Sequence, residues 1–139
     1  DILQGKYQQC VLGTLDQNGY PYLSKTLPLY YEKKIYLLLS DLSDHTENLK
    51  NNKKVSIYFA LEETHKERLN NPRLTLLGLI EKLKLNKNDE LFVKLLKKYA
   101  LIEKSAKMWG KFLDFNFYKF KIQNSIYVKG FGKAYKKVI

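Results

Sequence analysis

The side chains that offer the most chemistry in this sequence lie between Ser40 and Leu49 (SDLSDHTENL). A polar stretch rich in capping residues predicts the start of a short helix, whose free N–H groups can receive an anion. Ser40, His45 and Asn48 are the candidates for holding that anion. The alternative is structural: the helix closes the end of a sheet, and His45 is a hydrogen-bonded packing residue. The sequence leaves both interpretations open.

Arg73 is the second candidate, because it begins a long apolar stretch at 72–84. Thr75 lies on the same face of the expected strand. A guanidinium in that position must reach solvent or bind an anion, since burying an unpaired charge costs several kcal/mol. A ligand carboxylate or phosphate would be held by a charge-assisted hydrogen bond. The preceding loop offers internal partners instead: Glu62, Glu63 and Glu67.

This chain lacks the residues that most kinds of catalysis require. With 2 histidines and 1 cysteine, a metal cluster built on either residue type is not expected. The sequence shows no Ser-His-Asp arrangement and no glycine-rich phosphate loop. It also has no pair of carboxylates in an apolar setting. What remains is a binding chemistry, suited to an anionic and partly flat organic ligand that brings its own reactivity.

The charge balance favours an anionic partner. The 139 residues carry a net charge of +11, from 25 basic and 14 acidic side chains. The lysines are spread along the whole chain, however, and only Arg68 and Arg73 are arginine. Proteins that recognise nucleic acid usually concentrate arginine, so the sequence argues against that partner. The remaining anions are a phosphate-bearing cofactor or the carboxylates of a porphyrin, and the alternative is a solvated lysine surface.

Nothing in the sequence indicates export or a membrane. No apolar run approaches the length of a membrane span. Residues 1–6 lack the basic and apolar regions of a signal peptide. The single cysteine, Cys10, cannot form an internal disulfide and is consistent with a reducing compartment. We therefore predict a cytoplasmic protein.

The candidate residues lie on a pattern of short strands. Apolar runs predict strands at 9–15, 22–30, 34–40, 54–60, 72–84, 115–122 and 125–135. Asn18-Gly19 predicts a hairpin turn, and the first three strands should form a meander. Gln123-Asn124 predicts a second hairpin, between the last two strands. The expected core residues are Leu12, Leu37, Leu39, Val55, Ile57, Leu74 and Leu76.

Two or three helices complete the pattern. The short helix that carries His45 should turn this histidine toward the body of the protein. Residues 88–99 have a cap residue, acids in the first turn, lysines in the last and an apolar stripe, which is typical of a helix packed on a sheet. Residues 103–111 predict a further short helix. About seven antiparallel strands on one core indicate an α+β barrel, closed or half-closed.

Several pieces of the sequence occur in an order that resembles a known family. The pieces are Asn18–Pro21, Ser24, Pro28, Ser40–Leu49, Pro72–Gly78, Asp114-Phe115 and Gly130–Ala134. Spread over residues 9 to 135, they resemble the HugZ/HutZ-type haem-utilisation proteins of the pyridoxamine 5'-phosphate oxidase-like split-barrel group. The resemblance implies a homodimeric split β-barrel that binds haem at the dimer interface and opens the porphyrin ring oxidatively, for iron acquisition.

The resemblance also implies roles for single residues. Arg73 matches the arginine expected near a haem propionate, with Thr75 beside it. His45 occupies the place where flavin-binding relatives often carry a phosphate-contacting lysine. Asp114 matches a carboxylate that orients the iron-ligating histidine across the dimer, and its alternative is an ordinary turn aspartate. The ligating histidine is expected after the Gly-Phe-Gly strand, but none occurs before the chain stops at Ile139.

Three functions therefore remain open for the single split-barrel domain at 1–139, which is complete or lacks a family extension. The first is haem binding and haem oxygenase-like degradation. The second is an FMN-dependent oxidoreductase with Ser40, His45 and Arg73 near the flavin phosphate. The third is a non-catalytic relative that binds an anionic ligand. The sequence does not decide between haem and FMN, and it does not identify the electron donor or the position of ring opening.

Overall fold

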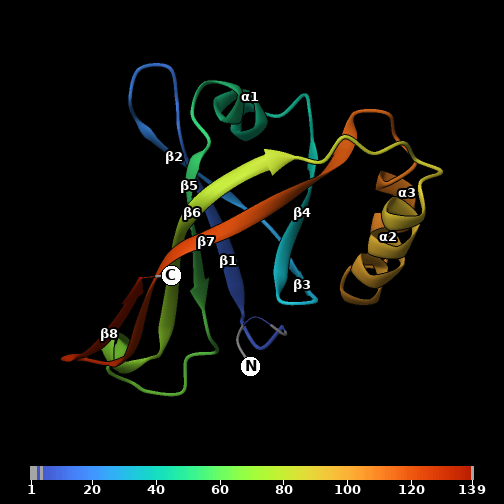
Figure 1. Ribbon diagram of the computed structural model, residues 1–139. Coiled ribbons are helices and arrows are strands. Elements are labelled where there is room, and N and C mark those ends of the chain that lie inside the picture. The colour runs from blue at the N-terminus through green and yellow to red at the C-terminus, as the bar shows by residue number, and fades with distance from the viewer. Residues whose placement is uncertain (1–2, 4, 139) are drawn as a thin grey trace.

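Eight strands form one antiparallel sheet in the computed structural model, which describes residues 3 and 5–138 (Figure 1). The strands are β1 (Gln9–Leu15), β2 (Pro21–Lys25), β3 (Leu29–Tyr31), β4 (Lys34–Ser40), β5 (Lys54–Ala60), β6 (Arg73–Lys82), β7 (Phe115–Gly130) and β8 (Lys133–Val138). Their order is β2-β1-β5-β6-β7-β4-β3, and β8 pairs with β7. The edge strands β2 and β3 do not pair with each other, so the sheet curls without closing. The predicted α+β split barrel is confirmed.

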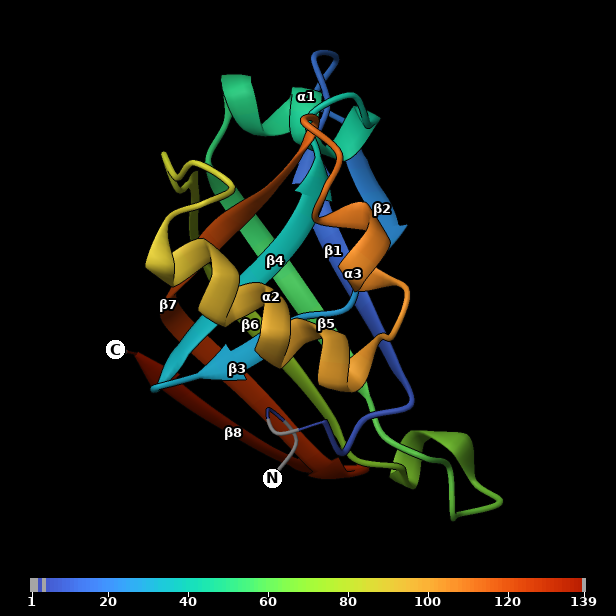
Figure 2. The same cartoon turned by 90° about the vertical axis from the view of Figure 1, so that its right-hand side faces the viewer.

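Three α-helices and a short 3-10 helix accompany the sheet within the described residues. They are α1 (Asp44–Asn51), α2 (Glu90–Ile102), α3 (Ala106–Trp109) and the 3-10 helix η2 (Arg68–Asn70). Figure 2 shows α2 lying across β4 and β3, with α3 beside it, while α1 covers one end of the sheet. None of the described helices has the length and apolar character needed to cross a membrane.

Strand β4 connects the two parts of the hydrophobic core. Ile35, Leu37 and Leu39 point into the barrel, where they pack with residues of β1, β5 and β6. Tyr36 and Leu38 point the other way and pack against α2. A strand covered on both faces needs apolar residues at every position. This explains the continuous apolar run in the sequence. Of the predicted core residues, all are buried except Leu74, which is half-buried against the same core.

The predicted meander is wrong at its second strand. The segment 22–30 is broken at 26–28, and its two halves pair with different strands. Proline at position 28 has no N–H to donate, which interrupts the ladder. The first half continues as β2 on β1, and the second half becomes β3 on β4. This segment therefore crosses the opening of the barrel.

The predicted hairpin at Gln123-Asn124 is also wrong. Strand β7 runs without a turn for 16 residues, and its register against β6 shifts between Leu77 and Gly78. A Cβ at Gly78 would lie 2.0 Å from the Lys121 carbonyl oxygen, so only glycine permits this approach. The polar pair marks a bulge, and the turn comes later, at Gly132 (φ 77°).

Candidate functional site

The start of α1 is stabilised by contacts among its own side chains. Ser43 is the N-cap residue, but no side chain caps α1 in the described structure. The Ser43 hydroxyl donates to the Ser40 carbonyl oxygen (2.8 Å) and lies 2.8 Å from His45 Nε2. Thr46 Oγ1 donates to the same carbonyl oxygen (2.6 Å). The Thr46 N–H donates to the Ser43 carbonyl oxygen (3.1 Å), so the N–H groups of Asp44 and His45 are the ones left for an anion at this helix end.

His45 is half-buried at this helix end. Burial lowers the pKa of its imidazole, and the neighbouring Asp44 carboxylate opposes that effect. The ring is therefore neutral near pH 7. A neutral imidazole meets an anion as a hydrogen-bond donor and not as a cation. His45 thus offers a weaker anion contact than the lysine whose place the resemblance assigns to it.

Ser40 and Asp114 are brought together from positions far apart in the chain. Ser40 Oγ donates a 2.6 Å hydrogen bond to Asp114 Oδ2, and the Asp41 N–H donates to the Asp114 carbonyl oxygen (2.6 Å). Sequence reasoning selected both residues but gave no reason to expect this contact. The bond ties the end of β4 to the start of β7. Because the Ser40 hydroxyl donates to Asp114, it is not available to donate a hydrogen bond to an incoming anion.

Asn48 has a packing role in the structure. Its side chain is buried (7% exposed), and its Nδ2 donates to Thr14 Oγ1 (3.0 Å), which is also buried. The bond fixes α1 to β1. Because a buried amide without a partner is costly, this contact stabilises the end of the barrel.

A cavity of about 450 Å³ opens beside the α1 end, in the gap between the edge strands and the α2–α3 region. Ser40 and His45 line its polar part. Tyr99 and Trp109 line its aromatic part, and sequence reasoning missed both. The Tyr99 hydroxyl donates to the Leu27 carbonyl oxygen across the opening. A flat ligand with an anionic end fits this arrangement.

Arg73 lies at the opposite end of the sheet, near η2 (Figure 1). Its Nη1 donates to the carbonyl oxygens of Leu69 (3.1 Å) and Asn71 (3.2 Å). Within the described residues it forms no ion pair with the loop glutamates proposed as internal partners. Arg73 and Arg68 line one cavity of about 180 Å³. The cavity lined by Ser40 and His45 does not include Arg73. The structure therefore separates the predicted site into two groups.

Thr75 belongs to a row of side chains across the outer face of the sheet. Val11, Tyr58, Thr75 and Ile126 are successive partners on β1, β5, β6 and β7. Directly paired residues point to the same face. Tyr58 is 37% exposed and the other three are half-buried, whereas the residues on either side of Val11, Tyr58 and Thr75 pack in the core. This outer row is an apolar surface that no described α-helix covers in Figures 1 and 2.

No group of three or more metal-binding side chains is placed to hold a metal ion in the described part of the chain. The described residues thus offer two candidate anion sites, one at each end of the sheet. The first consists of the α1 end with His45. The second consists of Arg73 and Arg68 above the outer row.

Comparison with known proteins identifies the family. The family model for the CREG beta-barrel matches residues 14–138. The chain belongs to the CREG beta-barrel family. A search among curated proteins finds no significant match for this CREG beta-barrel chain.

Solved structures similar to this CREG beta-barrel chain include the haem-binding protein from Mycobacterium smegmatis (TM-score 0.85, 20% identity). That alignment covers 99% of this chain and 55% of the other, so the chain spans about half the length of that protein. The haem storage protein HutZ from Vibrio cholerae aligns with a TM-score of 0.74 and 20% identity, over 87% and 84% of the two chains. The resemblance to HutZ-type proteins is confirmed.

A third similar structure carries a different family name. It is the protein from Clostridium acetobutylicum related to general stress protein 26, of the pyridoxinephosphate oxidase family. It aligns with a TM-score of 0.73 and 22% identity, over 99% of this chain and 89% of the other. At such identities these likenesses show the fold, and the split barrel is common to all three.

Proposed function

We propose that this protein binds haem over the outer face of its sheet and acts as a haem oxygenase-like protein of iron acquisition. The observation that carries the proposal is the Arg73 guanidinium. It heads an otherwise apolar strand, and its recorded partners are two carbonyl oxygens. Both bonds use Nη1, so the Nη2 and Nε donors remain for a carboxylate. A haem propionate suits that fork.

The surroundings of Arg73 fit a flat apolar ring with acidic groups on one edge. The outer row offers apolar and aromatic surface directly below the arginine. Arg68 adds a second cation to the same cavity. The names of two similar structures, a haem-binding and a haem storage protein, support haem as the ligand. Haem would supply the redox chemistry when bound. The chain would supply orientation, propionate pairing and exclusion of water.

A homodimer is part of this proposal. The two candidate anion sites lie at opposite ends of one sheet, and the outer row between them is apolar and half-exposed. Two-fold packing of the outer faces would place the Arg73 end of one protomer beside the α1 end of its partner. Light scattering should then report twice the mass of one chain. Tyr58→Lys, in the middle of the outer row, should give the monomer. A monomeric wild type would exclude this arrangement.

Asp114 keeps a proposed role in iron ligation. Its Oδ2 accepts the Ser40 bond, which leaves Oδ1 as an acceptor. An iron-ligating histidine from outside residues 1–139 could donate to Oδ1, which would fix its tautomer and orientation. The alternative is that Asp114 only ties β7 to β4. Asp114→Asn in a chain carrying that histidine separates these roles by the haem spectrum.

An FMN-dependent oxidoreductase is the second candidate function. The observation that favours it is the start of α1, which no described side chain caps and where Ser40 and His45 line a cavity together with Tyr99 and Trp109. A flavin phosphate would bind the first-turn N–H groups, and the isoalloxazine ring would lie against Trp109. A flavin bound there would not contact Arg73 of the same chain.

Spectroscopy distinguishes the candidates. The purified protein should show a saturable Soret band on titration with ferric haem, and no flavin absorption. A yellow protein whose flavin is displaced by phosphate would support the second candidate. If neither ligand binds, the protein is a non-catalytic relative, and both enzymatic proposals are wrong.

A further inference from the structure

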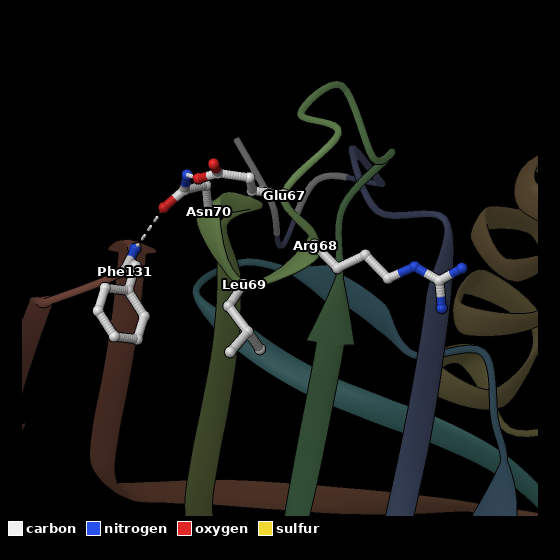
Figure 3. A pocket seen from close by; sticks show the side chains of 5 residues that line it. All are labelled: Glu67, Arg68, Leu69, Asn70 and Phe131. Atoms are coloured by element: carbon white, nitrogen blue, oxygen red, sulfur yellow. Dashed lines mark hydrogen bonds between the residues drawn. The ribbon is translucent and has the colours of Figure 1, made fainter.

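A ledge borders the outer face of the sheet at the Arg73 end, where Arg68 and Leu69 line one cavity with Tyr58 of the outer row. It consists of η2 and the β7–β8 turn, which are joined by a hydrogen bond from the Phe131 N–H to Asn70 Oδ1 (3.2 Å; Figure 3). The Asn70 amide also donates to Glu67 Oε2 (2.8 Å). The bond between Phe131 and Asn70 connects two segments that are 61 positions apart in the sequence.

A single buried asparagine holds the loop behind this ledge. Asn71 is 5% exposed, and its Oδ1 accepts the N–H groups of Thr64 and His65 (both 2.9 Å). Its Nδ2 donates to the carbonyl oxygens of His65 (3.2 Å) and Arg68 (3.1 Å). Four bonds to the backbone give an irregular loop a fixed shape. The backbone from which the η2 side chains project is therefore held in place without a ligand.

The ledge presents one cation and two apolar side chains. Leu69 is 60% exposed and Phe131 is 73% exposed, and Figure 3 shows both on the same side of the ledge. Together with Arg68 they line a cavity of about 390 Å³. The Arg68 side chain extends away from them, across the neighbouring strands, and also lines the cavity of Arg73.

Arg68 differs from Arg73 in having an uncommitted guanidinium. Its side chain is exposed and forms no hydrogen bond or ion pair among the described residues. Two like charges on one cavity repel each other, and an anion held between them removes that repulsion. Glu63 also lines this cavity but forms no ion pair with either arginine among the described residues. The chain has 23 lysines and 2 arginines, and both arginines line this one cavity.

We propose that Arg68 is a second positioning residue of the ligand site, and that Leu69 and Phe131 contact the face of the ligand ring. The site then selects a flat apolar molecule with two acidic groups on one edge, one group for each arginine. This inference rests on the proposed haem function. It adds Arg68, Leu69 and Phe131 to the site.

The test compares Arg68→Ala with Lys66→Ala, which removes the same charge from the same loop without touching either cavity. Ferric haem and its dimethyl ester, in which both acids are capped, are the probes. Arg68→Ala should weaken ferric haem binding about tenfold, as expected for one charge-assisted hydrogen bond. Lys66→Ala should change it less than about twofold, since it removes only an exposed charge. The dimethyl ester should bind wild type and Arg68→Ala equally.

A second pair tests the ring contact. Phe131→Ala should weaken the binding of both probes, because it removes an apolar contact with the ring and leaves the contacts to the propionates unchanged. Tyr20→Ala, an equally exposed aromatic at the other end of the sheet, is its control. Arg68→Lys should recover part of the lost affinity. Thermal unfolding of Arg68→Ala should match wild type, because the side chain is exposed.

The outcomes separate the two proposals. If wild type binds haem and Arg68→Ala behaves like Lys66→Ala, the role of Arg68 is wrong and the haem function stands. An equal loss with the dimethyl ester would also overturn that role, because the arginine would then not be acting on acids. If the wild-type protein binds no haem, both the proposed function and the role of Arg68 are wrong.

Discussion

The two ends of the sheet use their polar residues in different ways. At the α1 end, the polar side chains bond to one another or to nearby backbone: Ser40 to Asp114, Asn48 to Thr14, and Ser43 to the Ser40 carbonyl oxygen. At the η2 end, a buried asparagine and backbone carbonyls satisfy the loop. The two guanidiniums keep donors without a carboxylate partner among the described residues.

This difference indicates that the α1 end stabilises the fold and that the η2 end is suited to bind a ligand. Polar groups that satisfy one another contribute to stability and have little left for a ligand. Cations held beside an apolar surface without an acid are costly to the fold and favourable to an anion. A polar cluster in the sequence is therefore a weaker sign of a ligand site than an arginine whose partners are missing.

The largest effect is expected at the η2 end. Arg73→Ala should weaken ferric haem binding by about ten- to a hundredfold, since one charge-assisted hydrogen bond contributes about 1.5–3 kcal/mol. Soret titration measures the affinity, and Arg73→Lys should recover only part of it. The free energy of unfolding should change little. A strongly destabilised variant with unchanged affinity per folded molecule would assign Arg73 to the fold.

At the α1 end the opposite pattern is expected for Asn48. Asn48→Ala removes the amide that donates to the buried Thr14 hydroxyl and should reduce the free energy of unfolding by about 1–3 kcal/mol. Chemical denaturation measures this loss. The haem affinity of the folded fraction should stay within about twofold, because a packing contact distant from the ligand does not couple to it. A large loss of affinity without destabilisation would move the site to α1.

Ser40→Ala should have a smaller effect on stability. It removes the 2.6 Å bond to Asp114, and one such partly buried bond contributes about 1 kcal/mol to the free energy of unfolding. Asp114→Asn is the matched variant, since its side-chain oxygen can still accept from Ser40 and should cost less. Equal losses in the two variants would mean that the carboxylate charge matters more than the bond. Denaturant midpoints at one pH measure both.

The smallest effect is the pH dependence from His45. Its pKa is lowered in the folded protein, chiefly by burial, so the folded state binds the proton more weakly than the unfolded chain does. The stabilising contribution is therefore present above the unfolded pKa of about 6.5 and is lost as the pH falls through the lower folded value. Stability should decline slightly from pH 7.5 to 5.5, and His45→Gln should remove that part of the decline. An unchanged pH profile in the variant would contradict this assignment.

Features that depend on neighbouring residues could be predicted from the sequence. The helix predicted over 88–99 is observed as α2 at 90–102, because its first-turn acid and its apolar stripe are local signals. The predicted cap and the predicted lysines in the last turn are wrong, since no described side chain caps the helix and its last turn has no basic residue. The hairpin at Asn18-Gly19 joins β1 and β2, with Asp16 Oδ1 accepting two N–H groups of the turn. The core strands follow from alternation, which reports burial wherever one face is covered.

Features that depend on distant pairing were decided by the tertiary structure. The break in 22–30 and the continuity of β7 depend on which strands lie alongside, and a polar pair can mark a turn or a bulge equally well. Ser40 and Asp114, 74 positions apart, meet only because β4 pairs with β7. The composition already held a signal for Arg68, as one of two arginines in a lysine-rich chain. Only the fold, by placing η2 above the start of β6, brings it to the cavity of Arg73. Local interactions therefore determine the elements, and long-range pairing determines which side chains share a site.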